Sequence, residues 1–125
     1  MKKRTIFLIL ILFSLFLNSC KYDFILPEVV PPPDNNGEPI SFATQVAPIF
    51  STGNKCTACH KPGDKSPDLT SANAFAQIVP NYINTTTPAS SKIYTIPKSG
   101  THYATISASQ AALILAWITE GAENN

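Results

Sequence analysis

Several features are scarce in this sequence, and each scarcity excludes a class of protein. Charged residues make up only 14% of the 125 residues, and nine Lys and Arg stand against eight Asp and Glu. Nucleic-acid binding needs a clear basic excess, so we expect no nucleic-acid partner. No apolar run approaches the roughly 20 residues that span a bilayer comfortably. Methionine occurs once, as Met1, and cysteine occurs three times, an odd number that needs an explanation in an exported protein.

The N-terminus has the form of a secretory signal peptide. Lys2-Lys3-Arg4 precedes a short apolar run over residues 6–17. The run ends in Leu17-Asn18-Ser19-Cys20, which resembles the lipobox of bacterial lipoproteins, where cleavage precedes a cysteine that becomes lipidated. We therefore expect residues 1–19 to be a signal peptide and Cys20 to carry a lipid anchor to the membrane. The alternative is an uncleaved membrane anchor with an incidental cysteine.

The mature chain would consist of a tether and one domain. Cleavage removes three of the nine basic residues and leaves six against eight acidic ones, so the mature chain has no basic excess. Residues 20–40 are rich in proline and predict an extended tether, and residues 41–125 are long enough for one small domain. Lys21 stands where an aspartate is associated with inner-membrane retention. This favours the outer membrane of the cell envelope and leaves open whether the domain is periplasmic or surface-facing.

The domain is expected to be all-α, since no alternating pattern is long enough for a confident sheet. A first helix is indicated by apolar side chains along one face after Ser41, a reasonable N-cap. These side chains are Phe42, Val46, Ile49 and Phe50. Pro48 lies inside the pattern and should kink or shorten this helix, because it cannot donate to the carbonyl of Thr44.

The last helix has the clearest signals. Ser107 and Gln110 have the spacing of a capping box, in which each side chain satisfies a backbone donor. An apolar stripe follows and Gly121 is placed to end the helix; the stripe consists of Leu113, Ile114, Trp117 and Ile118. Trp117 is expected to pack in the core, against the first helix or a cofactor. Residues 72–79 form a shorter helical candidate, and the stretch that follows is polar.

Cys56-Thr57-Ala58-Cys59-His60 has the Cys-X-X-Cys-His pattern of c-type haem attachment. Two thiols three positions apart on a tight turn can form thioethers with the two vinyl groups of one porphyrin. The next residue, His60, is then carried beneath the iron as its proximal ligand. With Cys20 lipidated, this pair accounts for all three cysteines.

Other readings of the motif are weaker. A thioredoxin-like dithiol normally follows a strand within a βαβ pattern, which this sequence lacks. A structural zinc site needs four ligands, and Cys56, Cys59, His60 and His102 are the only candidates apart from carboxylates. A third possibility is a disulfide between Cys56 and Cys59 in a structural or interaction lipoprotein without haem.

The region around the motif also resembles a family, the small cytochrome c-like domains of bacterial envelope lipoproteins and larger secreted proteins. The resemblance covers most of residues 42–124. Besides the haem motif it rests on Val46-Ala47-Pro48-Ile49-Phe50, Asp68-Leu69, Ser91-Lys92-Ile93-Tyr94 and the ending from Trp117 to Asn125. It implies a cytochrome c fold in which N- and C-terminal helices cross beside one covalent haem c, and it implies that a proline at position 48 is tolerated.

The second axial ligand departs from the pattern of that family, whose members often place a methionine shortly before the last helix. Here the only methionine is lost with the signal peptide, and the corresponding stretch is Gly100-Thr101-His102-Tyr103. His102 is the only other histidine, so we expect bis-histidine iron coordinated by His60 and His102. The alternative is an iron with an open sixth position.

The expected function is electron transfer in the cell envelope by a membrane-tethered, single-haem cytochrome whose redox partner proteins are unknown. No acid, base or nucleophile constellation is visible, so an electron carrier is favoured over an enzyme. The alternative function, a haem-based sensor of small ligands or a peroxidase-like protein, requires an open iron position.

Overall fold

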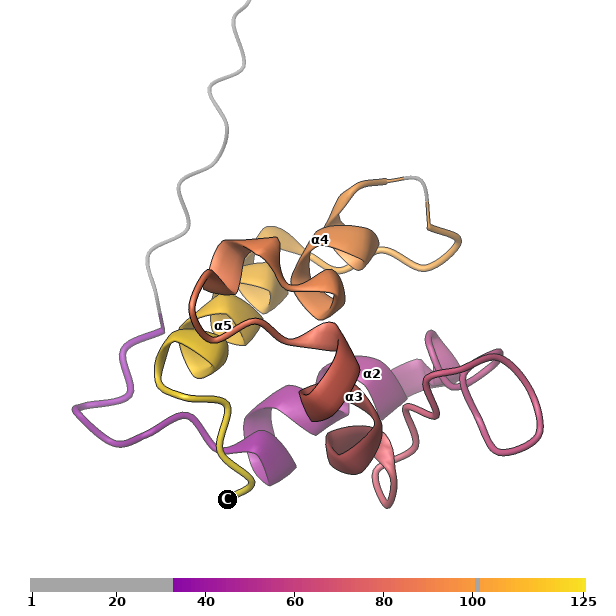
Figure 1. Cartoon of the computed structure of the whole chain (residues 1–125), viewed down its shortest axis with the longest axis horizontal. Helices are drawn as coiled ribbons and strands as arrows, with labels where there is room; N and C mark the ends of the chain where they lie inside the picture. The colour runs from indigo at the N-terminus through magenta and orange to yellow at the C-terminus, as the bar shows by residue number, and fades with distance from the viewer. Residues whose placement is uncertain (1–32, 101) are drawn as a thin grey trace, which may run out of the picture.

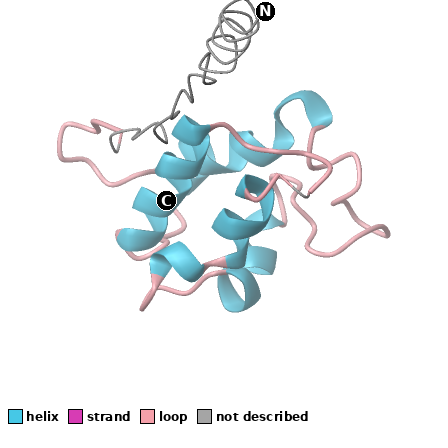
Figure 2. Cartoon of the chain, turned by 90° about the horizontal axis from the view of Figure 1, so that it is seen from above, coloured by secondary structure: helices cyan, strands magenta, loops and turns pink. Residues whose placement is uncertain are grey.

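The computed structural model describes residues 33–100 and 102–125, and in these ranges the chain is helical and contains no strand (Figures 1 and 2). The expected all-α class is therefore confirmed. The elements in chain order are η1 (Phe42–Val46), α2 (Ala47–Ser51), η2 (Thr52–Asn54), α3 (Ala74–Tyr82), η3 (Pro88–Ser90), α4 (Lys92–Lys98) and α5 (Ala108–Thr119). None of these helices is long and apolar enough to cross a membrane. The predicted signal peptide, Cys20 and most of the predicted tether lie outside the described residues.

The first helical segment changes its winding at the proline. Ser41 caps it by accepting a hydrogen bond from the Thr44 amide, as its position predicts. η1 is a π-helix, and the Ala47 amide donates to the carbonyl of Phe42, five residues earlier. α2 then begins with Pro48 in its first turn, where a missing N–H is tolerated. The predicted interruption at Pro48 is confirmed by this change from π- to α-helix and by the end of α2 at Ser51.

The last helix follows its sequence signals closely. The Ser107 hydroxyl accepts from the Gln110 amide at 3.1 Å, and the Gln110 side chain accepts from the Ser107 amide at 2.9 Å, so the capping box is complete. α5 ends at Thr119, and Gly121 follows with φ of +111°. The Ala122 amide then reaches back to the Trp117 carbonyl at 3.0 Å. This hydrogen bond closes the helix end in the way a Schellman turn does.

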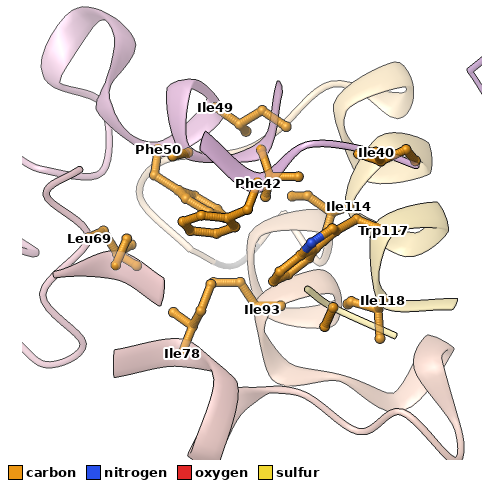
Figure 3. Close-up of a cluster of buried hydrophobic side chains, with 14 of the residues drawn as sticks. Ile40, Phe42, Ile49, Phe50, Leu69, Ile78, Ile93, Ile114, Trp117 and Ile118 are labelled. Carbon is orange, nitrogen blue, oxygen red and sulfur yellow. The ribbon is translucent and has the colours of Figure 1, made fainter. Parts of the chain in front are cut away.

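The core forms where α5 meets the first helical segment (Figure 3). The rings of Phe42 and Trp117 lie 5.1 Å apart, and Phe75 from α3 packs edge-on to Phe42 at 5.1 Å. The predicted packing of Trp117 against the first helix is confirmed. The predicted stripes are buried at Val46, Ile49, Phe50, Ile114 and Ile118, whereas Leu113 is only partly buried.

Hydrogen bonds join the first residues of the packed unit to its last residues. The Ala43 amide and the Ser41 hydroxyl both donate to the carbonyl of Asn125, and the Phe42 amide donates to its side-chain oxygen at 2.9 Å. Ile40 is buried in the core, and its amide donates to the Glu120 carboxylate at 2.8 Å. The packed unit therefore includes Ile40, at the end of the segment expected to be tether.

The middle of the chain differs from its prediction in detail. The helix expected over residues 72–79 is present as α3, displaced to Ala74–Tyr82. α4 falls in the stretch that the sequence indicated to be polar. It packs against α5, and its residue Ile93 is buried. Its seven residues include Pro97, which weakens any helix signal in the sequence. α4 therefore depends on tertiary packing more than on local propensity.

Candidate functional site

The haem-type motif lies on a turn directly after the first helical segment. Gly53 and Asn54 both have positive φ, +68° and +55°, so two successive left-handed residues redirect the chain. The amides of Cys59 and His60 then donate to the carbonyl of Cys56 at 3.2 and 2.8 Å. This tight turn brings the two thiols and the imidazole onto one short stretch of backbone.

The His60 ring is oriented by the backbone that follows it. Its Nδ1 lies 3.0 Å from the carbonyl oxygen of Pro67. A carbonyl can only accept, so Nδ1 carries the proton and the neutral imidazole has its free lone pair on Nε2. The Leu69 amide donates to the carbonyl of His60 at 2.9 Å and fixes the two segments together. Nε2 is therefore available as a metal ligand, with the second-shell hydrogen bond that such ligands usually have.

His102 approaches the same place from the loop between α4 and α5. Its Nδ1 lies 2.9 Å from the carbonyl of Ala104, which leaves Nε2 with the free lone pair by the same argument. The ring centres of His60 and His102 are 5.9 Å apart, and the ring planes differ by 26°. The structure thus brings together the two histidines, which are 42 positions apart in the sequence.

That separation has a chemical meaning. A metal–imidazole bond of about 2 Å and a further 1 Å or so from nitrogen to ring centre, counted on both sides, place two axial imidazoles roughly 6 Å apart. The observed 5.9 Å between ring centres is close to that separation, and the two rings are stacked with their planes 26° apart. Within residues 33–100 and 102–125 no group of three or more His, Cys, Asp or Glu side chains is arranged to hold a metal.

Both histidines line a hollow of about 240 Å³. Most of its wall is apolar and comes from α2, α4 and the loops that carry the histidines. The apolar side chains are Phe50, Pro67, Leu69, Ile93, Ile96, Pro97 and Ala104. Ser66, Lys92 and Ile96 are exposed, so the hollow opens to solvent on their side. Its character is that of an apolar slot with a few polar groups, as is usual for cofactor sites.

The two cysteines have different environments. Cys56 lines the hollow and is 7% exposed, whereas Cys59 is half-buried and lies outside the lining. Burial raises the pKa of the Cys56 thiol, and the neighbouring Lys55 ammonium partly opposes this. Both are free thiols, so the structure does not contain the disulfide considered as an alternative.

Asp68 organises the turn after the motif. Its carboxylate accepts from the amide and hydroxyl of Thr70 at 2.9 and 2.6 Å, and from the Asn73 side chain at 2.6 Å. The hydrogen bond from the Thr70 hydroxyl makes the largest contribution to lowering the pKa of Asp68, and the other hydrogen bonds act in the same direction. The turn leads into α3 and holds Leu69 buried beside the motif.

Four of the site residues could be identified from the sequence, but the other side chains that line the hollow could not. Cys56, Cys59 and His60 are signalled by their spacing, and His102 by being the only other histidine. The Pro67 carbonyl has no sequence signature, because every residue carries that group. Lys92 and Ile93 belong to a segment that contributed only to the family resemblance. No sequence pattern marked Tyr82 as part of the site.

Cys20, the predicted lipidation site, lies outside the described residues. No protein-family model matches the chain, and neither a curated protein nor a solved structure is similar to it.

Proposed function

We propose that this chain is a membrane-tethered, single-haem c-type cytochrome that transfers electrons in the cell envelope. The observation that carries the proposal is the pair of imidazoles, 5.9 Å apart at an apolar hollow beside a Cys-X-X-Cys-His turn. Each ring has its Nδ1 committed to a backbone carbonyl, so both Nε2 atoms are free to bind iron. Neither a dithiol enzyme nor a zinc site needs that arrangement.

Each residue then has a distinct role in a cytochrome c-like domain. Cys56 and Cys59 would hold the porphyrin through thioethers, and His60 and His102 would bind its iron. The haem c supplies a single electron reversibly, through ferric and ferrous iron. The carbonyls of Pro67 and Ala104 orient the two rings and raise their basicity. Because a Met/His pair raises the haem potential, bis-histidine ligation predicts a comparatively low one.

The hollow is too small to enclose a whole porphyrin. Its volume of about 240 Å³ is below the roughly 300–1,000 Å³ of pockets that enclose a whole small molecule. A bound porphyrin would therefore keep part of its surface in solvent, and the hollow is open beside Ser66, Lys92 and Ile96. An exposed edge is where a redox partner protein can approach for electron exchange.

The proposal is tested with the full chain produced alongside a c-type haem maturation system. We expect haem that resists denaturing extraction and a low-spin absorption spectrum in both oxidation states. His102→Ala should convert the spectrum to high-spin, and added imidazole should restore it. Tyr103→Ala is the matched control, because Tyr103 is adjacent in sequence and 96% exposed, and it should leave the spectrum low-spin.

The other outcomes are equally informative. A chain without covalent haem would overturn the proposal. A parent spectrum that is already high-spin would remove His102 from the iron. The alternative of a small-ligand sensor or peroxidase-like protein would then replace electron transfer as the leading function.

The proposed anchor is tested separately. We propose that Cys20 carries the lipid and that the proline-rich segment after it holds the domain away from the membrane, with the outer membrane as the favoured location. Cys20→Ser should move the protein from the membrane fraction to the soluble fraction of the cell envelope. Retention of the variant in the membrane fraction would contradict the lipid anchor.

A further inference from the structure

Two polar side chains from different helices line the hollow. Tyr82 is the last residue of α3 and Lys92 is the first residue of α4. The loop between them is closed at its base by Ser91, which is 1% exposed and whose hydroxyl accepts from the Asn84 amide at 2.9 Å. The same hydroxyl donates to the Asn84 carbonyl at 3.4 Å. This closure brings the end of α3 near the start of α4, and Tyr82 and Lys92 both line the hollow.

Neither of these polar groups is used within the protein. In the part of the chain that the structure describes, the Tyr82 hydroxyl and the Lys92 ammonium have no hydrogen-bond or ion-pair partner. Lys98 on the same helix differs, since its ammonium donates to the Tyr94 hydroxyl at 2.8 Å and does not line the hollow. A free hydroxyl and a free cation that line the same apolar slot are groups that can bind a carboxylate.

We propose that Tyr82 and Lys92 bind a carboxylate of the ligand that fills the hollow. The inference rests on the proposed function, in which that carboxylate is a propionate of the haem. The propionates lie on the edge of the macrocycle away from its two thioether positions. The groups that hold them must therefore come from elements other than the motif turn, and α3 and α4 supply them here. Ser66, the remaining polar side chain of the wall apart from the site residues, belongs to the loop after the motif.

The experiment uses the full chain with covalent haem, because the thioethers keep the cofactor in place whatever happens at Tyr82 and Lys92. Tyr82→Phe removes only a hydroxyl, and Lys92→Gln removes only the charge. Two quantities are measured: the propionate bending band in the resonance Raman spectrum, and the ferric–ferrous midpoint potential. Lys98→Gln is the control for charge loss on the same helix, and Lys92→Arg tests whether a different cation restores the parent behaviour.

We expect the propionate band to move in Tyr82→Phe and Lys92→Gln and to stay unchanged in Lys98→Gln. A less neutralised propionate favours ferric iron, so each of the two variants should shift the redox equilibrium about twofold to fivefold toward the ferric form, the range for a solvent-accessible pair. Lys92→Arg should keep the parent values.

Failure of this inference can be distinguished from failure of the proposed function. Covalent haem with parent-like Raman bands and potentials in both variants would overturn the inference alone. A shift in Lys98→Gln equal to that in Lys92→Gln would also overturn it, since the effect would then be a general loss of charge. A parent chain without haem would overturn the function together with the inference.

Discussion

His60 and His102 are held by the protein in different ways. The backbone of His60 is bonded to Cys56 on one side and Leu69 on the other, and its ring is bonded to Pro67. Three separate positions therefore fix its orientation. The ring of His102 is bonded to a carbonyl only two residues along its own loop. His60 is thus built into the framework of the motif, whereas the orientation of His102 depends on the conformation of one loop.

The two thiols should differ in reactivity in the haem-free chain. Burial raises the pKa of Cys56, so at mildly alkaline pH it keeps more of its thiol protonated, and the thiolate is the reactive form. Cys59 is more exposed. We expect iodoacetamide to modify Cys59 several-fold faster than Cys56, with the difference narrowing as the pH rises toward the raised pKa. Peptide mass spectrometry of timed samples measures both rates.

Urea provides the control for that experiment. In the unfolded chain the two thiols lose their different environments, so their alkylation rates should converge. Equal rates in the folded chain would show that Cys56 is not protected by the hollow.

Among the helices, those whose ends are set by residues close in sequence could be predicted, and those that depend on distant contacts could not. Both ends of α5 were predictable because Ser107, Gln110 and Gly121 act on backbone groups a few positions away. α4 was not predictable, since its only buried residue is Ile93 and it packs against α3, η3 and α5. The change of winding in the first segment was foreseen only as an interruption at Pro48. The π-helical form of η1 has no pattern of its own.

The capping box offers a direct test of element stability. Ser107→Ala removes the acceptor for the Gln110 amide and should lower the free energy of unfolding by about 1 kcal/mol. Urea denaturation followed by circular dichroism measures the change. Ser71→Ala is a suitable control, because Ser71 is exposed and outside every helix, and it should change stability by less than about 0.5 kcal/mol. Equal effects of the two substitutions would argue against the cap.

For the molecule as a whole, the hollow is an extension of the core. Phe50, Cys56, Leu69 and Ile93 belong both to the buried cluster and to the wall of the hollow. A domain of this size buries a modest fraction of its surface and is close to the limit at which a single core suffices. Apolar wall that faces an open hollow contributes less than it would if covered. Filling the hollow should therefore stabilise the entire fold, including the helices that do not touch it.

This coupling predicts a large difference in stability between the chain with haem and the chain without it. Every 100 Å² of apolar surface removed from water contributes about 2.5 kcal/mol, so covering the wall should raise the free energy of unfolding by a few kcal/mol. The comparison is between the parent and the Cys56→Ala, Cys59→Ala double variant, both unfolded in urea and followed by circular dichroism. Each truncation also removes one side-chain sulfur, so the haem-free parent serves as the matched reference.

Trp117 supplies an independent probe of the same transition. It is the only tryptophan in the chain and is 1% exposed in the core. A domain of this length has a radius of gyration of about 12 Å, so haem at the hollow lies close enough to quench its fluorescence by energy transfer. We expect weak emission from the folded haem protein and a rise on unfolding, at the same urea concentration as the loss of helix. His102→Ala keeps the thioethers but loses the bond from His102 to the iron. Its urea midpoint of unfolding should therefore lie between those of the parent and the haem-free chain. Coincident midpoints for all three would mean that the hollow is not coupled to the core.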